Sequence, residues 1–407
     1  NDMNEPSVFN GPEVSMPKDA LNLAGIEHRE WHNLYGLYMQ KATADGLTIR
    51  DPKKLARPFV LSRAFWAGSQ RYGAIWTGDN QATWGHLKIS SPMLLSINIA
   101  GLSFCGADVG GFFGEPDAEL FTRWFQAGSF TPFFRGHAHH DTKRREPWVF
   151  GEPYTSILRS TAMTRYSLLP YWYTVFYEAY STGMPIMRPL FVEFPSLSSI
   201  WSTEDQWMIG PALMVKPVTD PGHNTVNIWL PGNDIWYDFY SYKSVIGSDI
   251  KQITVPAPIE IIPVYIRGGS IIIKKMRLRR SASLMFYDAL TMIITPNKLD
   301  TAKGEIYLDD ETTLAHEINK EYLLRSFIYQ HKKIISITNQ KIRNYSPSNR
   351  IERVIITGQT NSPEKVFLNE FITDSETWVK KELLFVYERE RKIVTIKKPD
   401  VLISSDW

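Results

Sequence analysis

The chain has 407 residues, of which 43% are hydrophobic and 22% are charged, and its formal net charge is +2. This composition is typical of a globular protein with enough material for two or three domains, and the small net charge does not indicate a nucleic-acid partner. No apolar run approaches the ~18 residues of a membrane-spanning helix, so we expect no membrane span. Cys105 is the single cysteine, which excludes an internal disulfide framework and a cysteine-rich metal site.

Up to residue 183, short apolar runs alternate with amphipathic stretches, which is the pattern of β/α units. We predict helices near residues 31–39, after a cap at Asp117, and over 156–180 with a kink at Pro170. The first of these helices is expected to gather its apolar and aromatic residues on one face: Trp31, Leu34, Tyr35, Tyr38 and Met39. The predicted strands are 58–61, 73–76, 101–105 and 132–134. Polar residues follow each of these strands at once, as they do at the carboxyl ends of the strands in a (β/α)₈ barrel. We therefore expect residues 1–183 to be the C-terminal portion of a (β/α)₈ barrel, without its first strands.

From residue 184 the helical periodicity gives way to short β-rich runs that are broken by proline and glycine. This texture predicts two β-sandwich domains, a proximal one over 184–275 and a distal one over 276–407. The basic cluster at 274–280 is expected to be a solvated strand or turn face rather than a polyanion site.

Two carboxylates stand at predicted strand ends. Asp2 lies in Asn1-Asp2-Met3-Asn4-Glu5-Pro6, and Asp79 ends Trp76-Thr77-Gly78-Asp79. Cleavage of a glycosidic bond requires one carboxylate below the anomeric carbon and a second carboxyl group that protonates the leaving oxygen. Asp2 suits the first role and Asp79 the second. Taken alone, neither motif is specific, because D-x-N-E occurs in many loops and Asp79 could simply form an Asx-turn.

The combination of motifs is far more specific than either one. After the opening motif come Arg63 in Leu-Ser-Arg-Ala-Phe-Trp, then Trp-Thr-Gly-Asp, Gly106-Ala107-Asp108 and Arg135-Gly136-His137. In this order they strongly resemble glycoside hydrolase family 31, in particular its retaining α-glucosidases. The stretches 101–113, 144–148 and 166–170 resemble the branch of the family that trims N-glycans in the endoplasmic reticulum. The resemblance extends over nearly the whole chain.

The resemblance implies that Asp2 is the nucleophile and Asp79 the acid/base. It implies that Arg63, Asp108 and His137 bind the hydroxyls of the cleaved sugar. It also implies a set of apolar residues that line the sugar pocket: Met3, Trp66, Trp76 and Phe112. The expected protein is an exo-acting α-glucosidase that needs no cofactor. It removes terminal α-linked glucose from oligosaccharides, and the expected natural substrate is the α-1,3-linked glucose of N-glycans. A location in the lumen of the endoplasmic reticulum and a lectin-like β subunit are further implications.

Three alternatives stay open. An α-1,4-glucosidase of the same family is one. A metal hydrolase is a second, because His137-Ala138-His139-His140-Asp141 contains an H-x-H motif, although the remaining histidines form no second ligand group and we expect no metal. An inactive fragment is the third, since a barrel without its first strands exposes parallel edges and cannot close its core. For this reason we expect the 407-residue chain on its own to be inactive.

Overall fold

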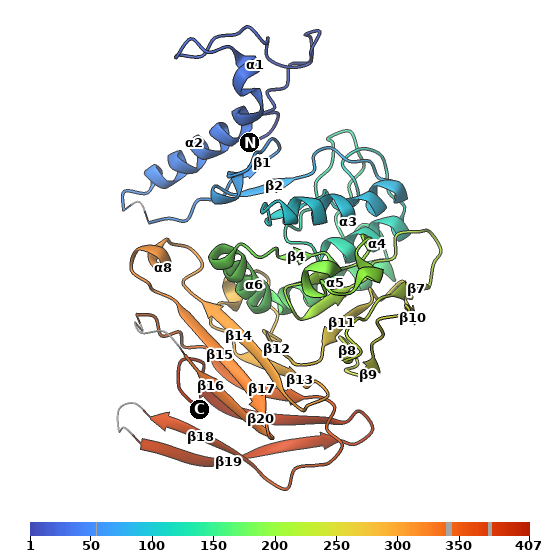
Figure 1. The fold of residues 1–407 in the computed structure, drawn as a ribbon, viewed down its shortest axis with the longest axis vertical. Helices are drawn as coiled ribbons and strands as arrows, with labels where there is room; N and C mark the ends of the chain where they lie inside the picture. Colours follow the sequence, from blue (N-terminus) through green and yellow to red (C-terminus); the bar gives the residue numbers. More distant parts are fainter. Residues whose placement is uncertain (54, 339–343, 373–376) are drawn as a thin grey trace.

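The computed structural model describes residues 1–53, 55–338, 344–372 and 377–407. Figure 1 shows an elongated molecule in which the helices α1 and α2 lie at one end and the last β-sheet lies at the other. The helices α3 to α6 and a smaller β region lie between them. Within the described ranges, every helix is too short or too polar to cross a lipid bilayer.

A parallel sheet of three strands in the order β1-β2-β3 forms the centre of the first region, with β1 at Leu61–Ser62, β2 at Ala74–Trp76 and β3 at Cys105–Gly106. Each strand coincides with the end of a predicted one. The stretch 132–134 is not a regular strand, but the Phe133 amide donates to the Cys105 carbonyl at 3.0 Å, so this stretch lies beside β3. Polar residues that follow these strands are therefore brought to one edge of the sheet.

The helix α2 (Tyr35–Arg50) follows α1 (His28–Trp31) and begins later than predicted. Its buried face is formed by Gly36, Gln40 and Ala44, whereas Tyr38 and Met39 are exposed, so the predicted aromatic inner face is wrong. The reason is the close approach of the chain at Gly36, where a Cβ atom would lie 2.6 Å from the Cβ of Ala64.

The prediction for the next helices is confirmed in one case and corrected in another. Asp117 caps α4 (Ala118–Gly128) by accepting from the Leu120 amide at 2.7 Å, as predicted. The long helix predicted over 156–180 is two helices, α5 (Tyr154–Ser167) and α6 (Leu169–Thr182). Pro170 lies in the first turn of α6, where its missing N–H is not needed, so it starts a helix rather than kinking one. The helix α3 (Trp84–Ile99) is capped by Thr83.

The proximal β region contains a six-stranded sheet in the order β4-β5-β6-β11-β8-β9 and a hairpin-like pair of β7 with β10. Apolar side chains from both sheets, such as Met214, Trp236, Ile228 and Val255, belong to one buried cluster, as expected for a sandwich. The strands are β4 (Met187–Arg188), β5 (Trp207–Ile209), β6 (Leu213–Val215), β7 (Thr225–Ile228), β8 (Ile235–Asp238), β9 (Ser244–Ile246), β10 (Ile253–Pro256) and β11 (Val264–Arg267). A short helix, α7 (Leu190–Glu193), follows β4.

The distal region is one nine-stranded sheet in the order β16-β15-β14-β12-β13-β17-β20-β19-β18. Its two edge strands are tied by the C-terminal segment, because the Ser336 amide donates to Trp407 and the Phe371 amide donates to Asp406. The strands are β12 (Ser270–Lys274), β13 (Leu290–Thr295), β14 (Ala302–Leu308), β15 (Leu323–Gln330), β16 (Lys333–Ile337), β17 (Arg350–Ile356), β18 (Val366–Ile372), β19 (Thr377–Glu388) and β20 (Ile393–Leu402). The sequence analysis assigned residues 270–274 to the proximal domain, but they form β12, which pairs with β13 in this distal sheet. Strand pairing therefore crosses the domain boundary predicted at residue 275.

The basic cluster 274–280 is only partly solvated. Lys274 and Lys275 are both buried, and the Lys274 ammonium lies 3.5 Å from the centre of the Phe239 ring. Arg279 pairs with Asp288 through two hydrogen bonds of 2.7 and 2.9 Å. The expectation of a solvated face is therefore wrong for the first two lysines, because the Lys274 ammonium lies over Phe239 and the Lys275 ammonium donates to the Phe286 carbonyl.

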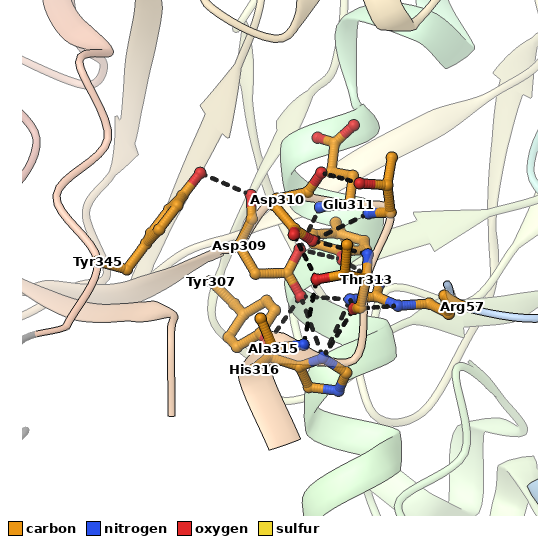
Figure 2. A network of polar contacts seen from close by, with 11 residues as sticks. Arg57, Tyr307, Asp309, Asp310, Glu311, Thr313, Ala315, His316 and Tyr345 are labelled. Atoms are coloured by element: carbon orange, nitrogen blue, oxygen red, sulfur yellow. Dashed lines mark hydrogen bonds and ion pairs between the residues drawn. The ribbon is translucent and has the colours of Figure 1, made fainter. Parts of the chain in front are cut away.

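A polar network joins the first region to the distal one (Figure 2). Asp309, which is almost fully buried, accepts hydrogen bonds from Arg57, Tyr173 and Tyr307 at 2.9, 2.5 and 2.9 Å. Arg57 also donates to the Thr313 carbonyl at 2.7 Å, just before the short helix α8 (Ala315–Ile318). Because Arg57 leads into β1, the distal loop supports the strand that ends at the candidate site.

Candidate active site

Asp2 is placed at the edge of the parallel sheet by its neighbour Asn1. The Asn1 backbone nitrogen donates to the Leu61 carbonyl at 2.5 Å, and the Arg63 amide donates back to the Asn1 carbonyl at 3.0 Å. This is the hydrogen-bond pattern of a parallel neighbour of β1. Buried Asn4 fixes the chain that follows, because its side chain donates to the Ser62 hydroxyl at 2.8 Å and accepts from the Ala64 amide at 2.9 Å.

Arg63 connects the two candidate carboxylates. Its Nη1 lies 3.2 Å from Oδ1 of Asp2 and 3.6 Å from Oδ2 of Asp79. These two oxygens contact the same nitrogen and cannot be farther apart than the sum of the two distances. Asp79 follows β2, whose end is held by the Thr77 amide donating to the Gly106 carbonyl at 3.1 Å. The structure therefore brings residues 2 and 79 together at one edge of the sheet.

Glu5 holds the other side of the Arg63 guanidinium. Nε and Nη2 of Arg63 donate to the two Glu5 carboxylate oxygens at 2.7 and 3.0 Å, in the planar fork geometry that suits a guanidinium and a carboxylate. These hydrogen bonds lower the pKa of Glu5 and raise the pKa of Arg63. Arg63 is thus oriented by one carboxylate while it presents Nη1 to two others.

Asp108, which follows β3, is 1% exposed and is clamped by Arg135. Nε and Nη2 of Arg135 donate to Oδ1 of Asp108 at 3.1 and 2.6 Å, and burial raises the pKa of the Asp108 carboxyl against the opposing effect of Arg135. Oδ2 of Asp108 is buried and has no hydrogen-bond partner among the described residues, so it retains the capacity to accept one. The Arg135 guanidinium also lies over the buried Trp76 ring, 5.0 Å from its centre.

The loop that carries Phe112 is tied to the end of β2 by Asn80. Oδ1 of Asn80 accepts from the Phe112 amide at 2.8 Å, and Nδ2 donates to the Asp108 carbonyl at 3.0 Å. The Phe112 ring packs against His137 with ring centres 5.3 Å apart and planes at 31°. Aromatic, amide and imidazole groups from three loops therefore meet beside Asp108.

The predicted site residues do not all meet in this cluster. Side-chain contacts or adjacency in the chain connect seven of them: Asp2, Arg63, Asp79, Trp76, Asp108, Phe112 and His137. Met3 adjoins Asp2 and is 36% exposed with φ of 57°. Trp66 is 46% exposed and lines a separate cavity together with residues of the 13–34 segment.

Sequence reasoning assigned no role to Glu5, Arg135 or Asn80, although all three stand in or beside the quoted motifs. The available signal was a charged or amide side chain one to three residues from a candidate site residue. Such a signal does not tell which charges pair with each other, because pairing depends on how neighbouring strand ends are arranged.

The histidine-rich stretch forms a separate exposed group. Ligand atoms of His139, His140 and Asp141 lie within 4.8 Å of one another, and His140 and Asp141 are largely solvent-exposed. Within the described ranges His137 is not a member of this group, although the rings of both His137 and His139 pack against Phe112.

Comparison with family models defines the class of protein. Residues 1–175 match the model described as the glycosyl hydrolases family 31 TIM-barrel domain, and residues 183–272 match the glycosyl hydrolase family 31 C-terminal domain. The two matches together cover more than half of the chain, which belongs to glycoside hydrolase family 31. The family and the barrel predicted from the motifs are confirmed.

Comparison with individual proteins shows which members of the family this chain is similar to. The chain is 50% identical over 412 residues to neutral alpha-glucosidase AB of Dictyostelium discoideum, an alignment that spans 100% of this chain and 42% of that protein. A crystal structure of a glucosidase II α subunit with alpha3-Glc2 bound has 41% identity and a TM-score of 0.91 over 99% of this chain and 45% of its own. An ER glucosidase II heterodimer, consisting of the catalytic subunit and the binding domain of the regulatory subunit, gives 41% identity and a TM-score of 0.92, with coverages of 99% and 45%.

Proposed function

We propose that the protein is a retaining, exo-acting α-glucosidase that removes terminal α-linked glucose from oligosaccharides, with Asp2 as nucleophile and Asp79 as acid/base. The observation that carries the proposal is the contact of both carboxylates with the same Nη1 of Arg63, from chain segments on the two sides of β1. Two carboxyl groups that face each other across a sugar-sized site are what glycoside hydrolysis needs.

The reaction proceeds in two balanced steps. Asp2 attacks the anomeric carbon as the bond to the leaving oxygen breaks, and Asp79 gives its proton to that oxygen, which leaves a glucosyl ester on Asp2. Asp79, now a carboxylate, takes a proton from water as the water oxygen attacks the anomeric carbon. The ester bond to Asp2 breaks, glucose leaves with its original α configuration, and both groups return to their starting states.

The remaining side chains bind the glucose in this proposal. Arg63 can donate to a sugar hydroxyl from Nη1, and the unpartnered Oδ2 of Asp108 can accept from another. His137 binds a hydroxyl near the reacting centre, while Phe112 presents an apolar ring face to the C–H face of the sugar. Trp76, buried with the Arg135 guanidinium over its ring, supports the apolar wall of the pocket. Met3 lines the pocket next to the nucleophile. Trp66, which lines the separate cavity, is assigned to sugars beyond the cleaved one.

The substrate class is proposed from the relatives. The glucosidase II structure with alpha3-Glc2 supports α-1,3-linked glucose of N-glycans as the natural substrate. The heterodimer supports a regulatory, lectin-like β subunit as partner and the lumen of the endoplasmic reticulum as location. Because the chain spans 42% of its curated relative, these properties are proposed for the native protein that contains it. An α-1,4-glucosidase remains the second candidate, and the 407 residues alone are proposed to be inactive.

The configuration of the product tests the proposal directly. The native protein is mixed with an α-glucoside, and the anomeric proton signals of released glucose are followed by NMR before mutarotation. We expect α-glucose first. Early release of β-glucose would contradict the double displacement, and comparison of α-1,3- with α-1,4-linked disaccharides distinguishes the two substrate candidates.

A further inference from the structure

A cavity of about 580 Å³ lies on the distal sheet and is lined by residues of three neighbouring strands. Thr291 comes from β13, Arg353 from β17 and Lys397 from β20 (Figure 1). Val354 and Ile396, the chain neighbours of the two cations, belong to the buried apolar cluster of this sheet. Because successive side chains of a strand point to opposite faces, Arg353 and Lys397 point away from that core. The cavity therefore lies on the outer face of the sheet, and it shares no lining residue with the candidate active site.

The lining of this cavity is mainly cationic. Its acidic members are Asp288 and Glu352, and Asp288 is already bound by Arg279 through two hydrogen bonds of 2.7 and 2.9 Å. The basic residues of the lining outnumber them: Arg277, Arg350, Arg353, Lys397 and Lys398. Within the described part of the chain, the last three form no side-chain hydrogen bond or ion pair. The cavity therefore holds a surplus of positive charge that the protein does not neutralise.

Two of these cations stand directly opposite each other in the sheet. Arg353 and Lys397 are partners in the antiparallel pair of β17 and β20. Side chains at such positions have Cβ atoms about 4.5–5.5 Å apart, and like charges placed there destabilise a sheet. No acidic side chain among the described residues forms an ion pair with either one. An anion bound between them would remove this repulsion.

The backbone is irregular in both strands at the same place. The register of β17 against β20 shifts just before Arg353, so Glu352 is an extra residue in β17. On β20, Lys398 and Asp400 have φ of 45° and 53°, in the left-handed region that residues with a Cβ atom adopt rarely. Bulges of this kind redirect side chains and recur beside binding sites. As a result Lys397 and Lys398 both line the cavity, although consecutive residues of a regular strand face opposite sides.

The floor and one wall of the cavity are built from buried groups. Thr291 is 5% exposed, and its hydroxyl makes no hydrogen bond to any residue that the structure describes, so it can donate one to a ligand. Buried Asn349 donates to the carbonyls of Phe286 and Asp288 at 2.8 and 3.0 Å. These two bonds hold the segment that places Tyr287 and Asp288 in the lining. The donors thus converge on a preformed wall.

We propose that this cavity is a binding site for a phosphate group, which either free phosphate or the headgroup of a phospholipid can supply. Guanidinium and ammonium groups donate charge-assisted hydrogen bonds to phosphate oxygens, and a guanidinium can do so in a planar fork. A phosphate dianion neutralises two like charges at once, which a single carboxylate does not. The site goes beyond the proposed glucosidase function and does not depend on it, so its test uses binding and not turnover.

The experiment measures binding of inorganic phosphate to the native protein by calorimetry, at constant ionic strength so that screening does not change. We expect saturable binding by the parent. Arg353→Gln should raise the Kd about tenfold, because it removes a charge-assisted hydrogen bond. Lys303→Gln is the matched control: it removes an exposed cation from β14 of the same sheet, outside the cavity, and should leave the Kd unchanged.

Flotation with phosphatidylcholine vesicles, prepared with and without phosphatidic acid, distinguishes the two sources of phosphate. Binding of free phosphate without flotation identifies a soluble ligand, and flotation that requires phosphatidic acid identifies a lipid headgroup. A parent that binds neither ligand overturns the proposal. So does an unchanged affinity in Arg353→Gln, or an equal loss in Lys303→Gln, which would reveal a general effect of charge. If Arg353→Gln does not fold, Lys397→Gln on the opposite strand replaces it under the same criteria.

Discussion

Glu5 and Arg63 form a planar pair in which both Glu5 oxygens accept from the guanidinium, at 2.7 and 3.0 Å. The pair leaves Nη1 of Arg63 directed at Asp2 and Asp79. Glu5 thus acts as a positioning residue, because it orients the guanidinium group that contacts both carboxylates.

Substitution of Glu5 should reduce activity and alter the response to acid. Glu5→Gln keeps one acceptor and loses the charge, and we expect kcat/KM for an aryl α-glucoside to fall about tenfold. The lowered pKa of Glu5 stabilises the fold above its ordinary value near 4.3, and this gain is lost as pH falls through the lowered value. The Tm of parent and variant should therefore converge as pH falls below the ordinary glutamate value of about 4.3. Equal activity of the two proteins would contradict the positioning role.

The two candidate carboxylates should respond differently to removal. Asp2→Ala should abolish turnover of every substrate, because no nucleophile remains. Asp79→Ala should slow hydrolysis of poor leaving groups by about 10²–10⁴-fold and that of activated aryl glucosides far less, since the latter need no proton. Asp220→Ala, at an exposed acid that pairs with Lys88, is the control. A uniform loss across leaving groups in Asp79→Ala would remove its assignment as the acid.

Arg135 should control the ionisation of Asp108. Burial raises the pKa of Asp108 and Arg135 opposes that rise, so loss of the guanidinium should raise the pKa further. A carboxylate that takes up a proton loses its charge and part of its capacity to accept hydrogen bonds, and a raised pKa moves this loss to higher pH. We expect the acid limb of the kcat/KM profile to move to higher pH in Arg135→Lys and farther in Arg135→Gln. Superimposable profiles for the three proteins would show that Asp108 is not used in its ionised form.

Because of Lys274, the stability of the folded protein should depend on pH in the neutral to alkaline range. Burial lowers its pKa from 10.5 to about 7, so between these values the unfolded chain binds more protons than the folded one. Stability from this group consequently rises with pH over that range and is lowest at and below pH 7. Lys274→Met should raise Tm most near pH 6 and least near pH 10, as measured by calorimetry. A constant difference across this range would contradict the inferred protonation.

A chelator should leave turnover unchanged. The proposed steps use two carboxyl groups and water, and the His139–His140–Asp141 group lies on an exposed stretch. We expect the kcat of native protein to be the same before and after dialysis against EDTA. Loss of activity that zinc restores would revive the metal-hydrolase alternative, and His140→Ala would then show whether this group is the ligand set.

Local sequence was sufficient for several parts of the fold. Gly-rich or polar residues after short apolar runs marked the ends of β1, β2 and β3, and Asp117 was correctly read as a helix cap. These features depend on residues a few positions apart, and such information is present in the chain itself. The aromatic face predicted for α2 failed because the close approach of Ala64 to Gly36 selects another face, and that approach is made by a distant part of the chain.

By itself, the sequence determined the family and singled out Asp2 and Asp79 as the candidate carboxylates, because the motifs stand in a fixed order along the chain. Only the tertiary structure decided that Arg63 touches both of them, that Glu5 and Arg135 hold Arg63 and Asp108, and that Trp66 lines a cavity of its own. The physical reason is that ion pairs and cavities depend on distances between strand ends separated by tens of residues. Those distances are set by the register of the sheet, and composition and spacing carry no direct record of it.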